Sequence, residues 1–373
     1  MIVVFDDVVV AAACCVLVGV AFVALPALSD RTLPLGVAVP AEHVGDRVVQ
    51  EAVQRYRRRV VVLALLGVVV AAALAPLRDV AAVALPGYLV TAGALLAFTR
   101  SRRSITAAKA AGRWYEGVPT RLVAPVTAAG VPRAGVPTGA YALGLALTAV
   151  TAAVGAALYP GLPARVPTHF GGGGLPDAFA PRSIATVFAP VAAAALLTVA
   201  FFGLAHALRR GPVRLRAGLP AHLASARSLA GDRAAQRVLA AATLLAALLI
   251  DVLALDAWTS PARLRLAGPA VVVFLLAVAG VIAASAVGYA RELRDLEGDA
   301  GRAGAAARPQ APDDDRAWRG GLVYVDRDDP VLWVPKRNGI GWTLNLGHPA
   351  GVALAGVLLA LVVASLVLVT VGG

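Results

Sequence analysis

The stretch GPAVVVFLLAVAGVIAASAVGYA, residues 268–290, contains no acidic or basic side chain from end to end. A transmembrane helix needs about 20 predominantly apolar residues to cross the hydrocarbon core of a bilayer. This stretch is long enough, and the charged run RELRDLEGD, residues 291–299, follows it directly. Residues 268–290 are therefore expected to cross a membrane as one helix.

The composition of the whole chain agrees with that expectation. Of its 373 residues, 59% are hydrophobic and only 15% are charged, and the mean hydropathy is +0.77. An ordinary soluble domain carries about 25% charged residues. The chain is thus too apolar to keep its surface in water, and the lipid bilayer is its predicted partner.

Similar apolar runs recur along the sequence, separated by clusters of charge. They predict an all-α integral membrane protein with about eight transmembrane helices and a small β-rich cytoplasmic segment before the last helix. The second and third runs nearly touch through residues 76–79, which predicts a tight helical hairpin. The expected spans are residues 8–27, 60–77, 79–98, 138–159, 187–208, 236–255, 268–290 and 350–370.

Arginine placement predicts the orientation of these spans. Arginines crowd into loops 28–59, 99–137 and 209–235, and the intervening loops hold few. Because cytoplasmic loops carry the excess of Lys and Arg, these three loops are expected inside and both termini outside.

The Ala-, Gly-, Val- and Arg-rich composition is typical of an actinobacterial-type genome, which predicts the bacterial cytoplasmic membrane. The net charge of +12 then reflects topology, and no nucleic-acid-binding module is present.

The same pattern divides the chain into four parts. Residues 1–290 form a seven-helix membrane domain with an ordered outer loop at 159–186. Residues 291–311 are charged and then rich in Ala, Gly and Pro, as expected of a flexible linker. Residues 312–349 are the cytoplasmic β-rich segment, and residues 350–373 hold the final helix.

The outer loop reads YPGLPARVPTHFGGGGLPDAFAPRS, from Tyr159 to Ser183. Its prolines fix backbone angles and its glycines permit positive φ, which predicts a defined turn. His169 and Asp177 are candidates for ligand contact or for a salt-linked pair, with Arg182 as a counter-charge. Pro167 and Gly174 complete the candidate ligand-binding set. A purely structural loop is the alternative, and one His with one Asp makes an incomplete metal site.

The inner segment reads PDDDRAWRGGLVYVDRDDPVLWVPKRNGIGWTLNLGHP, from Pro312 to Pro349. Short alternating runs between turn residues predict small strands at the membrane face. Tryptophan suits the headgroup zone, and Lys and Arg suit anionic lipid. The segment is either a structural element docked on the membrane or a surface that binds a cytoplasmic regulator. The candidate docking residues are Trp333, Pro335, Lys336, Arg337, Gly341 and Trp342.

Asp251 lies within the apolar run LLAALLIDVLALDAW, residues 244–258. An ionisable group inside a membrane is costly and marks a candidate functional site. Asp251 is close to the outer end of its span, so its carboxylate is expected either to reach interfacial water or to form an intramembrane polar pair or pathway.

Motifs of soluble catalysis are absent from the sequence. It contains no GxxxxGK[ST] phosphate loop, no HExxH, no CxxC and no GxSxG elbow. No catalytic residue, cofactor or metal site is therefore predicted, and the chain is not expected to be an enzyme.

Three segments resemble one group of bacterial membrane proteins. LPARVPTHFGGGGLPDAFAPRS resembles the outer loop "IPxHWNxxGxxDxxxxK" of SdpI-type immunity proteins and their uncharacterised relatives, although Gly171 and Arg182 replace the usual Asn and Lys. LPLGVAVPAEHVGDRVVQEAVQRYRRR, residues 33–59, resembles their "FGVRVPxE…(Y)RR" cytoplasmic loop. The segment from Trp318 to Pro349 resembles a second uncharacterised domain often fused to them. The positions matching the outer loop are Pro163, Val166, Pro167, His169, Phe170, Gly174, Asp177 and Arg182.

This resemblance implies a non-enzymatic function. Characterised SdpI-type proteins confer immunity to a secreted toxic peptide and sequester a transcriptional repressor at the membrane. By that likeness the chain is expected to sense, or protect against, an extracellular peptide or envelope ligand and to tether a cytoplasmic regulator. A transporter of small solutes or peptides is the first alternative, with Pro86, Gly87 and Pro190 breaking helices and Asp251 as its polar residue. A membrane scaffold is the second, and no oligomeric state is predicted.

Overall fold

The computed structural model describes residues 2–29, 31–74, 80–117, 132–171, 174–210, 221–302, 313–337, 342–357 and 359–360. Most of these residues are helical, as the apolar runs predicted. The long helices are α1 (Ile2–Leu28), α2 (Arg47–Leu74), α3 (Val80–Ala111), α4 (Thr138–Leu158), α5 (Ile184–Arg210), α6 (Ala221–Thr259) and α7 (Ala267–Arg302). Residues 349–357 and 359–360 are also helical.

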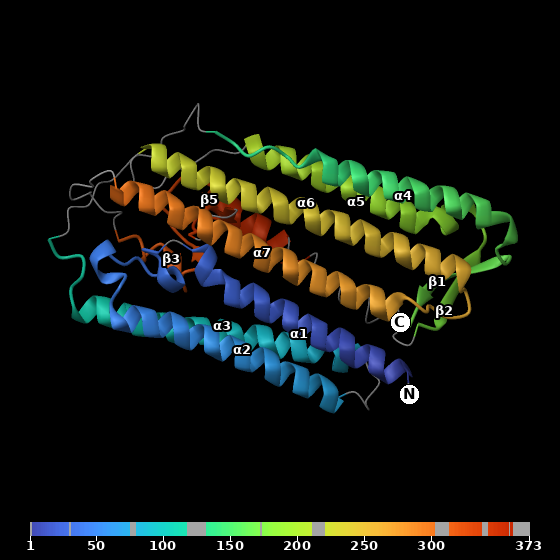
Figure 1. Ribbon diagram of the computed structural model, residues 1–373, viewed down its shortest axis with the longest axis horizontal. Coiled ribbons are helices and arrows are strands. Elements are labelled where there is room, and N and C mark those ends of the chain that lie inside the picture. The colour runs from blue at the N-terminus through green and yellow to red at the C-terminus, as the bar shows by residue number, and fades with distance from the viewer. Residues whose placement is uncertain are drawn as a thin grey trace.

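The long helices lie side by side along the long axis of the molecule (Figure 1). Helices α1, α2 and α3 pack on one another, and so do α4, α5 and α6. Helix α7 contacts both α1 and α6 and joins the two groups of three.

Six helices in the described part of the chain are long and apolar enough to cross a membrane. They are Val8–Leu28, Val83–Ala111, Thr138–Gly161, Ile184–Arg210, Ser225–Thr259 and Ala267–Leu296. Large apolar side chains project outward from the bundle, among them Tyr88, Leu196 and Val273. Exposing such an apolar surface to water is unfavourable, whereas contact with lipid chains is favourable. The chain is therefore a multi-pass membrane protein.

The expected number of eight spans is larger than the six found. The apolar part of α2 begins only at Val60, because Arg57, Arg58 and Arg59 fill the preceding turn. Residues 75–79, which include the expected hairpin turn, lie outside the described residues. Most of the expected eighth span, residues 350–370, also lies outside them.

Four described helices extend beyond the expected spans at the same end of the bundle. Helices α2 and α6 already begin at Arg47 and Ala221, and helices α3 and α7 continue to Ala111 and Arg302. These extensions are rich in Ala and Arg, which favour helix formation in water as well as in lipid. Hydropathy shows only the apolar part of such a helix.

The strands form three antiparallel pairs. β1 (Arg165–Phe170) pairs with β2 (Pro176–Pro181), β3 (Trp318–Arg319) with β4 (Val323–Tyr324), and β5 (Trp333–Pro335) with β6 (Trp342–Leu344). The four short inner strands agree with the predicted β-rich segment. The β1–β2 hairpin was not predicted, since its prolines argue against strands. A two-stranded ribbon has open edges on both sides, where the missing N–H of proline costs no ladder bond.

The two ordered loops lie at opposite ends of the bundle. The β1–β2 hairpin lies at the end where α1 begins, and β3 lies beside the other end of α1 (Figure 1). A loop of residues 33–40 is buried at this second end, next to α1, α2 and α3. The two ends are called below the hairpin end and the inner end.

Candidate functional site

The β1–β2 hairpin is fixed to the loop between α6 and α7. The backbone N–H of Leu264 donates a hydrogen bond to the carbonyl of Gly174 at 2.9 Å. Gly174 has φ +70°, and a Cβ there would lie 3.0 Å from the carbonyl oxygen of Leu264. Only glycine adopts this conformation readily and leaves room for the contact. The candidate residue Gly174 therefore attaches the hairpin to the helices.

Arg182 fixes the other side of the hairpin. Its guanidinium donates hydrogen bonds to the carbonyls of Tyr159, Pro160 and Leu162, at 3.2, 3.1 and 2.5 Å. These carbonyls belong to the turn that ends α4, and the guanidinium also lies over the Tyr159 ring. The described partners of Arg182 are thus backbone carbonyls, whereas a counter-charge for Asp177 was expected.

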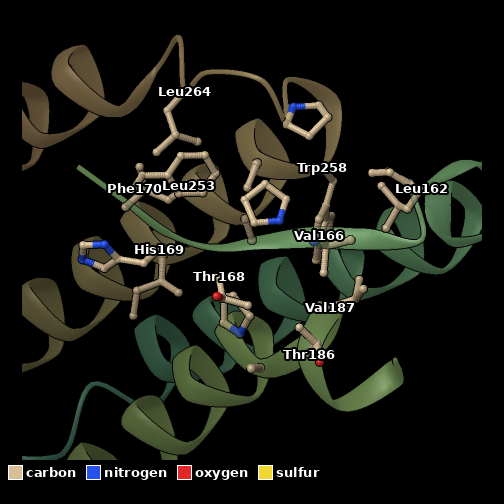
Figure 2. A pocket seen from close by; sticks show the side chains of 18 residues that line it. Leu162, Val166, Thr168, His169, Phe170, Thr186, Val187, Leu253, Trp258 and Leu264 are labelled. Atoms are coloured by element: carbon tan, nitrogen blue, oxygen red, sulfur yellow. The ribbon is translucent and has the colours of Figure 1, made fainter. Parts of the chain in front are cut away.

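A pocket of about 490 Å³ lies beneath β1, between α5 and α6. Figure 2 shows β1 crossing the space between the two helices, with Thr186 and Val187 on one side and Leu253 and Trp258 on the other. Its size falls within the range of roughly 300–1,000 Å³ typical of small-molecule sites. The lining is mostly aliphatic and aromatic, which suits an apolar ligand group. The lining residues that the sequence did not indicate include Leu162, Thr186, Val187, Ile250, Leu253, Ala257, Trp258 and Leu264.

His169 and Asp177 form the predicted pair beside this pocket. The Nδ1 of His169 lies 2.6 Å from the Oδ1 of Asp177. An irregularity in the β1–β2 register on both sides of His169 brings the two side chains together across the strands. They remain 70% and 52% exposed, so water screens their attraction. His169 lines the pocket, as do its neighbours Pro167 and Phe170, and therefore offers a polar contact to an occupant.

Asp251 is buried inside the three-helix group of α4, α5 and α6. Only 3% of its surface is exposed, so the expectation that it reaches interfacial water is wrong. The hydroxyl of Thr148 on α4 lies 2.8 Å from its Oδ2. Its Oδ1 has no hydrogen-bond partner among the described residues. The structure therefore favours the expected intramembrane polar pair.

The inner end contains an ion-pair cluster centred on Asp315. Its carboxylate accepts hydrogen bonds from Lys109 Nζ at 2.8 Å, Arg337 Nη1 at 2.6 Å and the backbone N–H of Ala38 at 3.0 Å. Burial raises the pKa of the Asp315 carboxyl, but these hydrogen bonds outweigh that effect and hold the pKa below its usual value. Lys109 also pairs with Asp313 at 2.7 Å. The cluster joins α3, the buried loop and the inner segment.

The buried loop carries the strained backbone of this cluster. Leu35 has φ +49°, which is unusual for a residue with a branched side chain, and Gly36 follows at +67°. The carbonyl of Gly36 accepts hydrogen bonds from both Arg102 and Arg337. A Cβ on Gly36 would lie 2.8 Å from the carbonyl oxygen of Gly321. The inner segment thus packs directly on the loop.

The candidate docking residues occupy different environments. Trp333 is 46% exposed and Lys336 is exposed, as docking requires. Arg337 was expected to face anionic lipid, but its side chain is only 5% exposed, because two aspartates and a carbonyl bind its guanidinium. Pro335 and Trp342 lie in the paired strands β5 and β6, while Gly341 lies outside the described residues.

The sequence reasoning missed most of the inner cluster. Asp315 and Arg102 were not among the candidate site residues, and the loop around Gly36 was noted only for the family resemblance of residues 33–59. Lys109 offered the one usable signal, since it is one of two lysines in a chain whose other basic residues are arginines. The ammonium group of lysine is compact and can lie between two carboxylates. The guanidinium group of arginine is planar and suits two parallel hydrogen bonds to one carboxylate instead.

Comparison with known families identifies two regions of unknown function. A family model described as a domain of unknown function (DUF1648) matches residues 146–194, which include most of α4, the hairpin and the start of α5. A second, described as a family of unknown function (DUF5808), matches residues 327–352 of the inner segment. These matches agree with the expectation of two uncharacterised domains. No curated protein and no solved structure matches the chain.

Proposed function

We propose that this chain is a non-enzymatic membrane receptor or immunity protein that binds the apolar part of a peptide or envelope ligand beneath the β1–β2 hairpin. The supporting observation is the pocket of about 490 Å³ between β1, α5 and α6. Its apolar lining suits a hydrophobic group, and His169 and Asp177 offer polar contacts beside it. The resemblance of this loop to SdpI-type proteins favours a peptide.

In this proposal the hairpin end faces outward in a bacterial cytoplasmic membrane. Helix α2 and residues 350–370 then cross the membrane as well, which makes eight spans and leaves both termini outside. The exposed apolar side chains of Leu65, Leu66 and Val69 on α2 support its crossing. Arginine-rich loops at the inner end support the orientation.

The inner segment would then bind a cytoplasmic regulator. Leu322, Val323 and Trp333 are exposed apolar side chains on this segment, and the exposed Lys336 adds positive charge. The ion pairs of Asp315 with Lys109 and Arg337 hold this surface against the helices. A movement of the helix ends on ligand binding would therefore move the docking surface.

Ligand protection of a pocket cysteine tests the binding proposal. Ala257→Cys lies in the pocket lining, and Ala164→Cys is an exposed control outside it, both in a Cys14→Ala, Cys15→Ala background. The probes are the secreted-peptide fraction of spent medium and the lipid extract of the source cells. The proposal expects either probe to slow maleimide labelling at position 257 and not at 164. Unchanged labelling at 257 with both probes would refute it.

Labelling of intact cells tests the orientation separately. Thr168→Cys and Val323→Cys place thiols at exposed positions at the two ends of the molecule. A membrane-impermeant maleimide should label position 168 in intact cells and position 323 only after lysis. Labelling of both positions in intact cells would exclude a topology in which the hairpin and the inner segment lie on opposite sides of the membrane.

A further inference from the structure

Asp251 has one satisfied and one unsatisfied oxygen in the interior of the bundle. Oδ2 has the Thr148 hydroxyl at 2.8 Å, whereas Oδ1 is fully buried and has no described partner. An ionised carboxylate in this state would lack the hydrogen bonds that it has in water. Removing a charge from water without compensation costs several kcal/mol or more.

Among the residues that the structure describes, no cationic side chain lies at the level of Asp251 on the helices packed against α6. The helices packed on α6 are α4, α5 and α7. The only titratable side chain of α4 is Tyr141, and α7 has none before Tyr289. In α5 the titratable residues are His206, Arg209 and Arg210, all in the last turns at the inner end. On α6 itself the nearest titratable residue is Asp256. Its carboxylate accepts hydrogen bonds from the backbone N–H groups of Arg265 and Leu266.

The recorded surroundings of Asp251 are too poor in ligands for a metal ion. The Thr148 hydroxyl is its described side-chain partner, while the buried Thr198 and Thr243 hydroxyls bond backbone carbonyls of their own helices. In the part of the chain that the structure describes, no group of three or more His, Cys, Asp or Glu could hold a metal. Calcium takes six to eight oxygen ligands, and magnesium needs an octahedral set. A proton needs one carboxyl oxygen.

Asp251 also lies close to the floor of the hairpin pocket. Ala254 and Trp258 line the pocket, and residues 251, 254 and 258 share one face of α6. With a rise of 1.5 Å per residue, Asp251 lies about 4.5 Å deeper along the helix than Ala254. His169, on β1, is the titratable side chain in the pocket lining.

We propose that Asp251 is an intramembrane proton-binding site that exchanges its proton with the outer solution through the hairpin pocket. The carboxyl is neutral when the pocket is empty. Thr148 can accept a hydrogen bond from the protonated carboxyl or donate one to the carboxylate, so the pair persists in both states. Loss of the proton leaves a bare charge beside the pocket, next to the lining residue Ile250, and favours entry of water or of a cationic ligand group.

Infrared difference spectroscopy tests whether the proton is present. The purified protein in vesicles should show the C=O stretch of a protonated carboxyl, and Asp251→Asn should lack it. Asp251→Asn preserves shape and the contact with Thr148, and Asp256→Asn is the matched control that should keep the band. A spectrum in which the band is absent, or survives in Asp251→Asn, would overturn the proposal.

Labelling with a hydrophobic carbodiimide tests the same site chemically, because this reagent modifies protonated carboxyls in apolar surroundings. Asp251 should be the labelled residue by mass spectrometry. Above its titration point, labelling should fall about tenfold per pH unit. Labelling that is lost on adding Na⁺ or Ca²⁺ at constant pH would instead indicate a metal site and overturn the proposal.

The route of exchange requires a variant that fills the pocket. Ala257→Phe adds bulk to the pocket lining, and Ala241→Phe adds the same bulk elsewhere on α6. Deuterium exchange of the carboxyl, followed by its infrared band, should slow several-fold in Ala257→Phe only. Equal exchange rates in both variants would refute access through the pocket. This result does not depend on whether the pocket also binds a peptide.

Discussion

At the scale of single residues, the side chains with the best-defined tasks are charges that the structure buries. Lys109 has only 10% of its side chain exposed and lies between Asp313 and Asp315. Arg337 is buried beside it, and these two groups join segments that are distant in the sequence. The half-buried Arg182 joins the hairpin to the turn that ends α4. Each of these groups should respond strongly to substitution.

Removing the Lys109 ammonium should detach the inner segment. Lys109→Met leaves the carboxylates of Asp313 and Asp315 without their shared cation, but Asp315 keeps Arg337 and Asp313 is 37% exposed. The cost should therefore lie below the roughly 3–5 kcal/mol of breaking a fully buried ion pair. The melting temperature of Lys109→Met in detergent should fall clearly. That of Lys109→Arg should fall too, because the planar guanidinium group does not replace the compact ammonium group. Lys336→Met, at an exposed position, is the matched control and should leave the melting temperature unchanged.

Acid should weaken the same cluster through Asp315. The folded-state pKa of Asp315 is lowered, so its stabilising contribution is complete above the unfolded-state value of about 3.9. That contribution is lost as the pH falls below about 4 towards the lower folded-state pKa. Melting temperatures measured from pH 6 downward should show this loss in the natural protein. In Asp315→Asn the melting temperature should be lower at pH 6 and should lack the part of the acid dependence due to Asp315.

At the scale of elements, one close backbone contact attaches the β1–β2 hairpin to the α6–α7 loop. Gly174→Ala should lift the hairpin from the α6–α7 loop, since the new Cβ meets the Leu264 carbonyl at a strained positive φ. Maleimide labelling of Ala257→Cys should then accelerate as the pocket opens. Gly171→Ala is the control, because its Cβ would meet Asp177 at an ordinary 3.4 Å. Equal acceleration in both variants would show that the contact with Leu264 is unimportant.

How well each helix or strand could be predicted from the sequence depended on whether lipid or water surrounds it. Apolar runs in lipid can be recognised from composition, so α1, α4 and α5 agree with their expected ranges. The inner extensions of α2, α3, α6 and α7 carry charged side chains, so hydropathy does not detect them. The β1–β2 hairpin was missed because proline content normally argues against strands, and only its open edges permit it.

At the scale of the whole molecule, the arrangement places the two ordered loops at opposite ends of one bundle. Helix α7 joins the group of α1, α2 and α3 to the group of α4, α5 and α6. The hairpin and its pocket belong to the second group, and the buried loop around Gly36 belongs to the first. A signal from the pocket to the inner segment would therefore pass through α6 and α7.

The proposed eight crossings would place both termini on the same side, and the arginine-rich inner loops predict that this side is outside. Epitope tags added to the two ends of the full chain should both be removed by protease added to intact cells. A third tag, inserted after Arg302 where α7 ends, should be protected until lysis. Protection of the C-terminal tag alone would show that residues 350–370 do not cross, and would reduce the count to seven.

The sequence by itself determined the solvent of this protein, the approximate positions of its helices and the two loops that carry ordered structure. These properties depend on local composition, which can be read from consecutive residues. The tertiary structure decided which side chains meet: Asp315 with Lys109 across 206 positions, Asp251 with Thr148 across 103, and β1 with α5 and α6 around a pocket. Such contacts depend on how helices pack, and helices of similar hydropathy can pack in many ways.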